Sequence, residues 1–204
     1  MNYLNDLQKY SLQTCPLKTF ELWFTKALEK EENPSAFSLA TSSKDGTPSV
    51  RYLLFKGLRD SRFCFFTHKQ SPKAKDFKEN PKAAMAFYWH NTGKQVRISG
   101  TVEEMPSTMV QDYCQKRPRL SKAATFISKQ SQQIFNKEDL LNEFDQCLKK
   151  FEGKEIPVPP HWGGSSIKPL EIEFFVYGEH RLNDRFLYKK EDTEHSWNIK
   201  RLAP

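Results

Sequence analysis

The chain has 204 residues, 37% hydrophobic and 13% aromatic, a composition that excludes intrinsic disorder and predicts a real core in one domain or at most two small ones. Its formal net charge of +7 suits partners that carry negative charge, such as phosphate ligands, nucleic acid or an anionic membrane. No window approaches the roughly 18 apolar residues of a membrane span, and the first residues, MNYLND, lack the basic and apolar regions of a signal peptide.

Helices and short strands follow one another along the chain. Residues 1–15 are expected to form a flexible N-terminal arm and residues 16–204 a single domain, which begins with an amphipathic helix over about 16–31. The further elements are expected as strands at 36–41, 49–56 and 63–67, a helix at 72–79, strands at 83–89 and 95–105, helices at 107–116, 121–129 and from 136 to 153, and strands at 169–178, 184–190 and 196–202.

The spacing of the strands indicates the fold class. Asp45-Gly46 and Asn91-Thr92-Gly93 are turn signals between neighbouring strands. Short strands joined by hairpins favour an antiparallel β-barrel with helices packed outside it, which is an α+β fold. Strands and helices do not alternate regularly and no G-x-G-x-x-G motif is present, so a Rossmann domain is not expected. Residues 157–164, rich in proline and glycine, are predicted to form an irregular loop.

The stretch from Arg51 to Lys56 places a cation at each end of an apolar strand. Side chains alternate between the two faces of a strand, so these two cations should point to opposite sides, toward two anions or toward one anion and solvent. A surface strand with two solvated ends is the alternative. The apolar residues of the stretch are expected to be buried, and Tyr52 can join them: Val50, Leu53, Leu54 and Phe55.

Two further places carry candidate binding residues. Ser71-Pro72-Lys73-Ala74 puts a hydroxyl, free backbone N–H groups and a lysine at a helix start, which can bind an anion. Gln95 and Arg97 lie on one face of a strand, where Gln95 can read donors and acceptors on a planar heterocycle. For Arg97, the polar outer face of a sheet is the favoured interpretation.

The most specific candidate binding group consists of Tyr113, Arg117 and Ser121. Tyr113 and Arg117 are four apart on a helix and share a face, Pro118 ends that helix, and Ser121 lies just beyond the break. A phenol, a guanidinium and a hydroxyl at one bend can wrap a phosphate, although a basic helix end at the surface is the alternative.

The sequence shows no recognisable pattern for a metal site or for nucleophilic or acid–base catalysis. The five histidines form no metal-site pattern, and no nucleophile with a base, or pair of carboxylates, is recognisable. Redox chemistry on a bound organic cofactor is therefore the natural enzyme hypothesis. The four cysteines are scattered, as expected for reduced thiols in a cytoplasmic protein: Cys15, Cys64, Cys114 and Cys147.

Taken together, these segments resemble the pyridoxine (pyridoxamine) 5′-phosphate oxidase family, FMN enzymes that make pyridoxal 5′-phosphate. The resemblance covers about residues 17–204, in family order, and implies a split-barrel homodimer with FMN at the subunit interface. The matching segments are Arg51–Lys56, Phe66-Thr67, Ser71–Ala74, Asn80-Pro81, Gln95-Val96, Tyr113, Arg117-Pro118, Ser121, Gln130-Ser131, 162–164, Glu173-Phe174, 181–185 and 201–204.

The resemblance also implies roles for individual residues. Arg181 and Asn183 would lie over the pyridine ring as the catalytic pair. The substrate phosphate would be bound by Lys56, Tyr113, Arg117 and Ser121. FMN would be bound by Arg51, Lys56, Phe66, Thr67, Lys73, Gln95, Gln130, Ser131, Phe175 and Arg185. The family chemistry is hydride transfer from the C4′ carbon of the substrate to the flavin, followed by reoxidation with O₂ to hydrogen peroxide.

The sequence departs from the family pattern at several places. Pro72 replaces an arginine, Phe175 replaces a tryptophan, and Asn183 replaces a histidine, while the N-terminal arm lacks a pair of arginines. Three alternatives follow. They are a related flavin oxidase that acts on a phenazine-type ring, a protein that binds FMN or pyridoxal phosphate with little turnover, and, last, a nucleic-acid binder that rests on charge alone.

Overall fold

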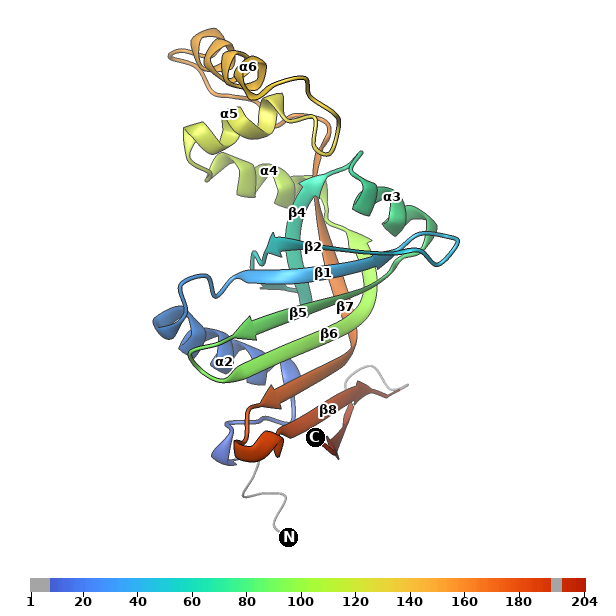
Figure 1. Cartoon of the computed structure of the whole chain (residues 1–204). Coiled ribbons are helices and arrows are strands. Elements are labelled where there is room, and N and C mark those ends of the chain that lie inside the picture. The colour runs from blue at the N-terminus through green and yellow to red at the C-terminus, as the bar shows by residue number, and fades with distance from the viewer. Residues whose placement is uncertain (1–7, 192–195) are drawn as a thin grey trace.

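The computed structural model describes residues 8–191 and 196–204. Among them, nine strands form one antiparallel sheet, with β2-β1-β5-β6-β7-β4-β3 in order and with β8 and β9 continuing from β7 (Figure 1). The strands are β1 (Ala36–Ser42), β2 (Pro48–Leu54), β3 (Leu58–Arg59), β4 (Arg62–His68), β5 (Lys82–Trp89), β6 (Lys94–Glu104), β7 (Trp162–Val176), β8 (Asp184–Lys190) and β9 (Trp197–Leu202).

Helices pack around this sheet and confirm the α+β class. They are α2 (Pro16–Lys30), α3 (Pro72–Glu79), α4 (Ser107–Gln115), α5 (Arg119–Ile127) and α6 (Lys137–Lys150), with a short 3₁₀ turn η1 (Glu179–Arg181). Helices α4, α5 and α6 gather at one end of the molecule, and β8 lies at the other (Figure 1). No helix of the described residues is long and apolar enough to cross a membrane.

The sheet closes on itself through a long shared strand. The first part of β7 pairs with β4 and its last part pairs with β8, while β6 runs beside most of its length. Backbone hydrogen bonds from Lys56 N to Cys64 O (2.8 Å) and from Cys64 N to Gly57 O (3.0 Å) connect the chain beyond β2 to β4. The result is the split antiparallel barrel that the sequence predicts.

A register shift between β6 and β7, where Leu170 of β7 is the extra residue, needs a glycine on β6. The β6–β7 register shifts between Ser99 and Gly100, and a Cβ atom on Gly100 would lie 2.1 Å from the carbonyl oxygen of Lys168. Only a residue without a side chain permits this approach of two backbones.

The core is aromatic and lies between the sheet and α2. Phe20 and Trp23 of α2 are almost fully buried, which fits the predicted amphipathic helix. The ring of Phe20 packs edge-on against Phe55 and Phe63, with centroids 5.3 and 4.9 Å apart. Such edge-to-face contacts add to the stabilisation from burial.

The predicted burial of the strand after Ser49 is wrong for half of its apolar residues. Phe55 is buried, but Val50 and Leu54 are 70% and 52% exposed, and Tyr52 is 80% exposed. Strand β2 lies at the edge of the sheet, and its alternation turns these three side chains to the outer face, where nothing in the described chain covers them. This edge is therefore an exposed apolar patch.

Strand β7 begins at Trp162, seven residues earlier than predicted, so the end of the predicted 157–164 loop is strand. Gly163 and Gly164 pair with Thr67 and Phe66 of β4. A Cβ atom on Gly164 would lie 2.8 Å from Met105 Sδ, so the glycine serves close packing rather than a turn.

The predicted arm falls partly outside the described residues, since residues 1–7 are not described. Residues 8–15 contact the domain: Leu12 is buried, Trp23 Nε1 donates to Tyr10 O (2.8 Å) and Tyr188 Oη donates to Gln13 O (2.8 Å). The flexibility of the arm stays a prediction.

Candidate active site

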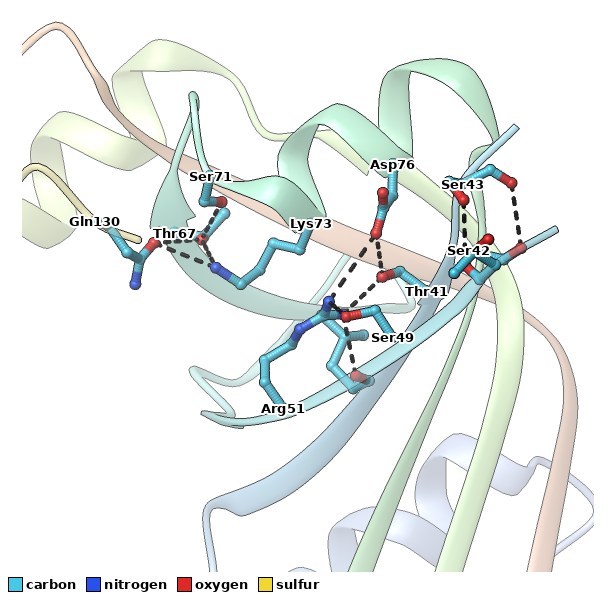
Figure 2. A network of polar contacts seen from close by, with 12 residues as sticks. Thr41, Ser42, Ser43, Ser49, Arg51, Thr67, Ser71, Lys73, Asp76 and Gln130 are labelled. Atoms are coloured by element: carbon cyan, nitrogen blue, oxygen red, sulfur yellow. Dashed lines mark hydrogen bonds and ion pairs between the residues drawn. The ribbon is translucent and has the colours of Figure 1, made fainter. Parts of the chain in front are cut away.

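A first group of polar residues gathers where β4 ends and α3 begins (Figure 2). Lys73 is 5% exposed, and its Nζ donates to Thr67 Oγ1 (3.1 Å) and Gln130 Oε1 (3.2 Å). Among the described residues no carboxylate forms an ion pair with Lys73. Burial, with the nearby charge of Arg51, lowers the pKa of Lys73 to about 8. A buried ammonium without a counter-ion is costly, and a bound anion would relieve that cost.

The start of α3 explains how Lys73 is placed. Ser71 is the N-cap and Pro72 the first helical residue, as predicted, because proline has no N–H to lose at that position. The buried Ser71 hydroxyl does not cap the helix but lies 3.4 Å from Thr67 Oγ1. Two hydroxyls therefore line the same spot as the lysine.

Arg51 of β2 faces this spot from the neighbouring sheet edge (Figure 2). Its Nη1 donates to Thr41 Oγ1 (2.7 Å), and its Nη2 donates to Ser49 Oγ (2.6 Å) and lies 4.0 Å from Asp76 Oδ2. Burial lowers the pKa of Arg51, and the charge of Asp76 opposes this. Arg51 is therefore oriented by residues of β1, β2 and α3.

A second cluster is an aromatic stack with two cations. Tyr113 of α4 stacks on Phe66 of β4, with centroids 4.0 Å apart and planes 12° from parallel, and Phe66 stacks on Trp162 (4.9 Å). The Arg117 guanidinium lies 5.0 Å from the Trp162 ring centre, and Lys56 Nζ lies 5.9 Å from that of Tyr113. These contacts bring Lys56, Tyr113 and Arg117 to one place, as predicted.

Ser121 joins this cluster through Thr125, a residue that the sequence did not single out. Arg117 Nη1 donates to Thr125 Oγ1 (2.6 Å), and that hydroxyl donates to Ser121 O (2.8 Å). The contact spans the bend between α4 and α5 and fixes the guanidinium against the next helix. Trp162 was also missed, because it lay in the predicted loop.

Ser131 is exposed and follows Gln130 in the segment between α5 and α6. Three further cofactor candidates lie on the outer face of the sheet. Gln95, Phe175 and Arg185 are direct neighbours across β6, β7 and β8, so their side chains share one row of that face. Gln95 Nε2 donates to Tyr177 Oη (3.1 Å). Phe175 packs edge-on against the Tyr177 ring, with centroids 5.2 Å apart. The row combines an aromatic ring, an amide and a guanidinium, the groups expected beside a planar heterocycle.

Glu173 neutralises the arginines of this face. Its carboxylate accepts from Arg185 Nε (2.8 Å) and Arg97 Nη1 (3.2 Å). Asp184, the residue next to Arg185 in the sequence, accepts from Tyr10 and Arg201 instead.

Arg181 and Asn183 lie in the turn between β7 and β8. Asn183 Oδ1 accepts from Gly178 N (3.1 Å), and Arg181, which is exposed, has a φ of 65°, the left-handed region that ordinary residues rarely adopt. Because the Asn183 side chain closes the turn, it has a structural contact besides any contact with a ligand.

The structure thus separates the candidates into two sets. We call one set the cation end: Arg51, Lys56, Phe66, Thr67, Lys73, Tyr113, Arg117, Ser121, Gln130 and Ser131. We call the other the hairpin end: Gln95, Phe175, Arg181, Asn183 and Arg185. The hairpin end belongs to the part of the sheet near β8, and most of the cation end belongs to the part near α3 and α4, on the opposite side of the molecule (Figure 1). A cavity of about 510 Å³ beside the cation end includes only Thr67 of the candidates.

Two family models match the chain. Residues 24–147 match "Pyridoxamine 5′-phosphate oxidase", and residues 162–204 match "Pyridoxine 5′-phosphate oxidase C-terminal dimerisation region". The second match contains β7, β8 and β9, hence nearly all of the hairpin end, and it supports a homodimer.

Relatives cover almost the whole chain. A pyridoxine/pyridoxamine 5′-phosphate oxidase of Aliarcobacter butzleri is 44% identical over 190 residues, 93% of this chain and 89% of that protein. The enzyme of that name from Salinibacter ruber is 40% identical, over 98% of this chain and 94% of its own.

Solved structures agree on the fold. PhzG from Burkholderia lata 383, in complex with tetrahydrophenazine-1-carboxylic acid, superposes with a TM-score of 0.87 at 27% identity, over 94% of each chain. A pyridoxamine 5′-phosphate oxidase-related, FMN binding protein from Nostoc punctiforme shares the fold, with a TM-score of 0.76 at 17% identity, over 94% of this chain and 100% of its own. On the family models and the near-full-length relatives together, this chain belongs to the pyridoxamine 5′-phosphate oxidase family.

Proposed function

We propose that this protein is an FMN-dependent oxidase that converts pyridoxine 5′-phosphate or pyridoxamine 5′-phosphate to pyridoxal 5′-phosphate, with O₂ as acceptor and hydrogen peroxide as product. One observation carries the proposal: the cation end holds two separate places where cations lack carboxylate partners among the described residues, one at Lys73 and one at Arg117. A phosphorylated cofactor and a phosphorylated substrate together need two such places.

Lys73 fits the phosphate of FMN. The lysine is buried, it contacts only neutral oxygen atoms, and Arg51 adds positive charge nearby. A phosphate here would accept from Nζ and from the Thr67 and Ser71 hydroxyls. FMN, when bound, supplies the hydride acceptor and passes the electrons on to O₂.

Arg117 fits the phosphate of the substrate. Its guanidinium is fixed by Thr125 and by the Trp162 face, while Lys56 and the Tyr113 phenol lie on the same aromatic stack. Ser121 is one helical turn from Thr125, at the same bend. A substrate without phosphate would leave these cations unpaired, so they favour a phosphorylated ring.

The hairpin end completes the site from a second copy of the chain. The catalytic pair, Arg181 and Asn183, directly precedes β8, which lies at the far end of the molecule from α4 and α5, the helices on either side of Arg117 (Figure 1). One chain alone is therefore a poor candidate to hold both ends of a small substrate. A homodimer brings the hairpin end of one copy to the cation end of the other. The exposed apolar edge of β2 supports such an interface.

Within that site, Arg181 and Asn183 face the substrate ring. The C4′ carbon gives up a hydride and its hydroxyl or amine group gives up a proton, so the substrate loses two electrons in all. O₂ takes up two electrons and two protons to form hydrogen peroxide. The alcohol substrate yields the aldehyde directly, whereas the amine yields an imine, which water hydrolyses to the aldehyde with release of ammonia. The Arg181 guanidinium stabilises negative charge that develops on the substrate, and the Asn183 amide supplies hydrogen bonds without titrating.

A related oxidase that acts on a phenazine-type ring is the second candidate, because PhzG superposes so well. The residues around Arg117 argue against it, since a phenazine ring carries no phosphate. A binding protein with little turnover is the third, motivated by Asn183. We also propose a cytoplasmic location, which the four free cysteines support.

The visible spectrum of the purified protein tests the proposal. The expected result is a yellow dimer whose flavin band bleaches when pyridoxine 5′-phosphate is added without air and returns, with peroxide, when air is admitted. A colourless protein that ignores added FMN would refute the flavin assignment. Bleaching by a phenazine precursor but not by pyridoxine 5′-phosphate would favour the second candidate, and a yellow protein that neither substrate bleaches would favour the third.

A further inference from the structure

The outer face of the sheet contains one buried carboxylate. Glu173, in the middle of β7, has only 9% of its side chain exposed, although its neighbours Ile172 and Phe174 are the residues that point to the core. It is buried because two arginine side chains lie over it, Arg97 from β6 and Arg185 from β8. A carboxylate is rarely buried unless it is paired, and this one is paired twice.

These contacts fix Arg185 on two sides. Its Nε donates to Glu173 Oε1 (2.8 Å), and its Nη1 donates to Ala203 O (3.0 Å), in the segment that follows β9. The hydrogen bond from Arg185 to Glu173 raises the pKa of the guanidinium, so the charge is kept at every relevant pH. Within residues 8–191 and 196–204, the Nη2 group of Arg185 makes no hydrogen bond.

The strand register accounts for this arrangement. Arg97 is the direct cross-strand partner of Glu173, whereas Arg185 pairs with Phe175, one row away on the same face. Glu173 therefore reaches diagonally into the row that holds Phe175 and Arg185. It also balances one of two positive charges that would otherwise repel each other.

A second acidic residue on the same face shows what an ordinary surface pair looks like. Glu171 lies two residues before Glu173 and forms an ion pair with Lys189 (3.2 Å), but these side chains are 39% and 63% exposed. Such a pair contributes little, because water competes for both charges.

We propose that Glu173 is a positioning residue that orients Arg185 so that its free Nη2 group is offered to the flavin. The inference rests on the proposed function, because it takes FMN as the ligand of this face. Without the Glu173 carboxylate, Arg185 keeps its charge but loses its fixed orientation, and Arg97 and Arg185 repel each other. FMN binding then weakens through Arg185 and not through a direct contact with Glu173.

A double-mutant cycle tests this on the full-length dimer. The free FMN concentration that half-saturates the apoprotein is measured from flavin fluorescence for the wild type, Glu173→Gln, Arg185→Ala and the double variant, with thermal unfolding and dimer mass as checks. Glu173→Gln should weaken FMN binding roughly tenfold. In the Arg185→Ala background the same substitution should weaken FMN binding by less than about twofold. Glu171→Gln, the matched control, should match the wild type.

Each other outcome contradicts the inference. Equal losses in both backgrounds would mean that Glu173 acts independently of Arg185, and no loss in either would mean that Arg185 needs no positioning. If Glu173→Gln fails to form a folded dimer, Arg185→Lys takes its place, because it keeps the charge but loses the Nε–H donor. It should bind FMN roughly tenfold more weakly if orientation matters, whereas unchanged binding would overturn the inference. A wild-type protein that binds no FMN would instead refute the proposed function.

Discussion

The cation end and the hairpin end differ in how their charges are balanced. At the cation end, Lys73 and Arg117 contact hydroxyl groups, an amide and an aromatic ring, but no carboxylate of the described residues. At the hairpin end, Arg185 is paired with the buried Glu173, which Arg97 also contacts. The comparison indicates different tasks: an unbalanced cation is ready to bind an anion, whereas a balanced one is held still as a directed hydrogen-bond donor.

The largest expected effect is at the cation end. Arg117→Ala should weaken the binding of phosphorylated substrate by about 2–4 kcal/mol. The contact between the guanidinium and the substrate phosphate is lost in the ground state and the transition state alike. KM should rise far more than kcat falls. Arg119→Ala is the matched control, since that guanidinium donates to the backbone oxygens of Phe151 and Lys154. Equal kcat/KM of the wild type for phosphorylated and unphosphorylated pyridoxine would contradict this, because the cation end would then bind no substrate phosphate.

Lys73→Met should weaken FMN binding by about 1.5–3 kcal/mol, the usual contribution of a charge-assisted hydrogen bond. The apoprotein should unfold at a higher temperature than the wild type, because a buried ammonium without a carboxylate is removed. Fluorescence titration and thermal unfolding measure the two effects. Lys75→Met, at an exposed position of the same helix, should change neither. Loss of apoprotein stability in Lys73→Met would show that the charge is already balanced.

The pH dependence of FMN binding should follow Lys73. Its pKa is lowered to about 8, and only the protonated form attracts the FMN phosphate, so affinity should fall as pH rises through 8. The stability of the apoprotein should change with pH in the opposite direction. Between about pH 8 and 10 the unfolded chain holds a proton that the folded chain has lost, so its stability should rise with pH. Titrations from pH 6.5 to 9.5 check both slopes. A slope in FMN affinity that persists in Lys73→Met would assign it to another group.

The smallest expected effect is at the hairpin end. Asn183→His should change kcat by about tenfold or less, roughly 1.4 kcal/mol, because the Asn183 side chain also closes the turn by accepting from Gly178 N. The variant should gain a pH dependence near 6.5, where an unperturbed histidine titrates. Arg181→Ala should be far more damaging. If the wild-type protein has no oxidase activity and Asn183→His gains it, the binding-protein alternative replaces the oxidase.

Local signals predicted the cation end well. Ser71 and Pro72 indicate the start of α3. The four-residue spacing of Tyr113 and Arg117 predicts that both lie on one helix face. These features depend on residues close together in the sequence. The antiparallel barrel followed from the same kind of reading, because hairpin turns are local.

Contacts across strands were beyond the sequence pattern. Nothing local links Glu173 with Arg97, which lies 76 residues away and meets it only through the β6–β7 register. Glycines at 163 and 164 indicated a loop, although they allow β7 to pack closely. Val50 and Leu54 were expected to be buried, and in a single chain they are exposed. An apolar strand shows that its side chains need covering, but not which surface covers them.

We propose that each active site combines the cation end of one copy with the hairpin end of the other, and mixed dimers test this arrangement. Arg117→Ala and Arg181→Ala are each prepared with a different affinity tag. The two impaired proteins are unfolded and refolded together at equal amounts, and activity is measured at a substrate concentration well below the KM of Arg117→Ala. If the site is shared, each mixed dimer has one intact site, and activity should return to about one quarter of the wild-type value. If each chain holds a complete site by itself, every site in the mixture carries a substitution, and activity should stay at the level of the separate variants.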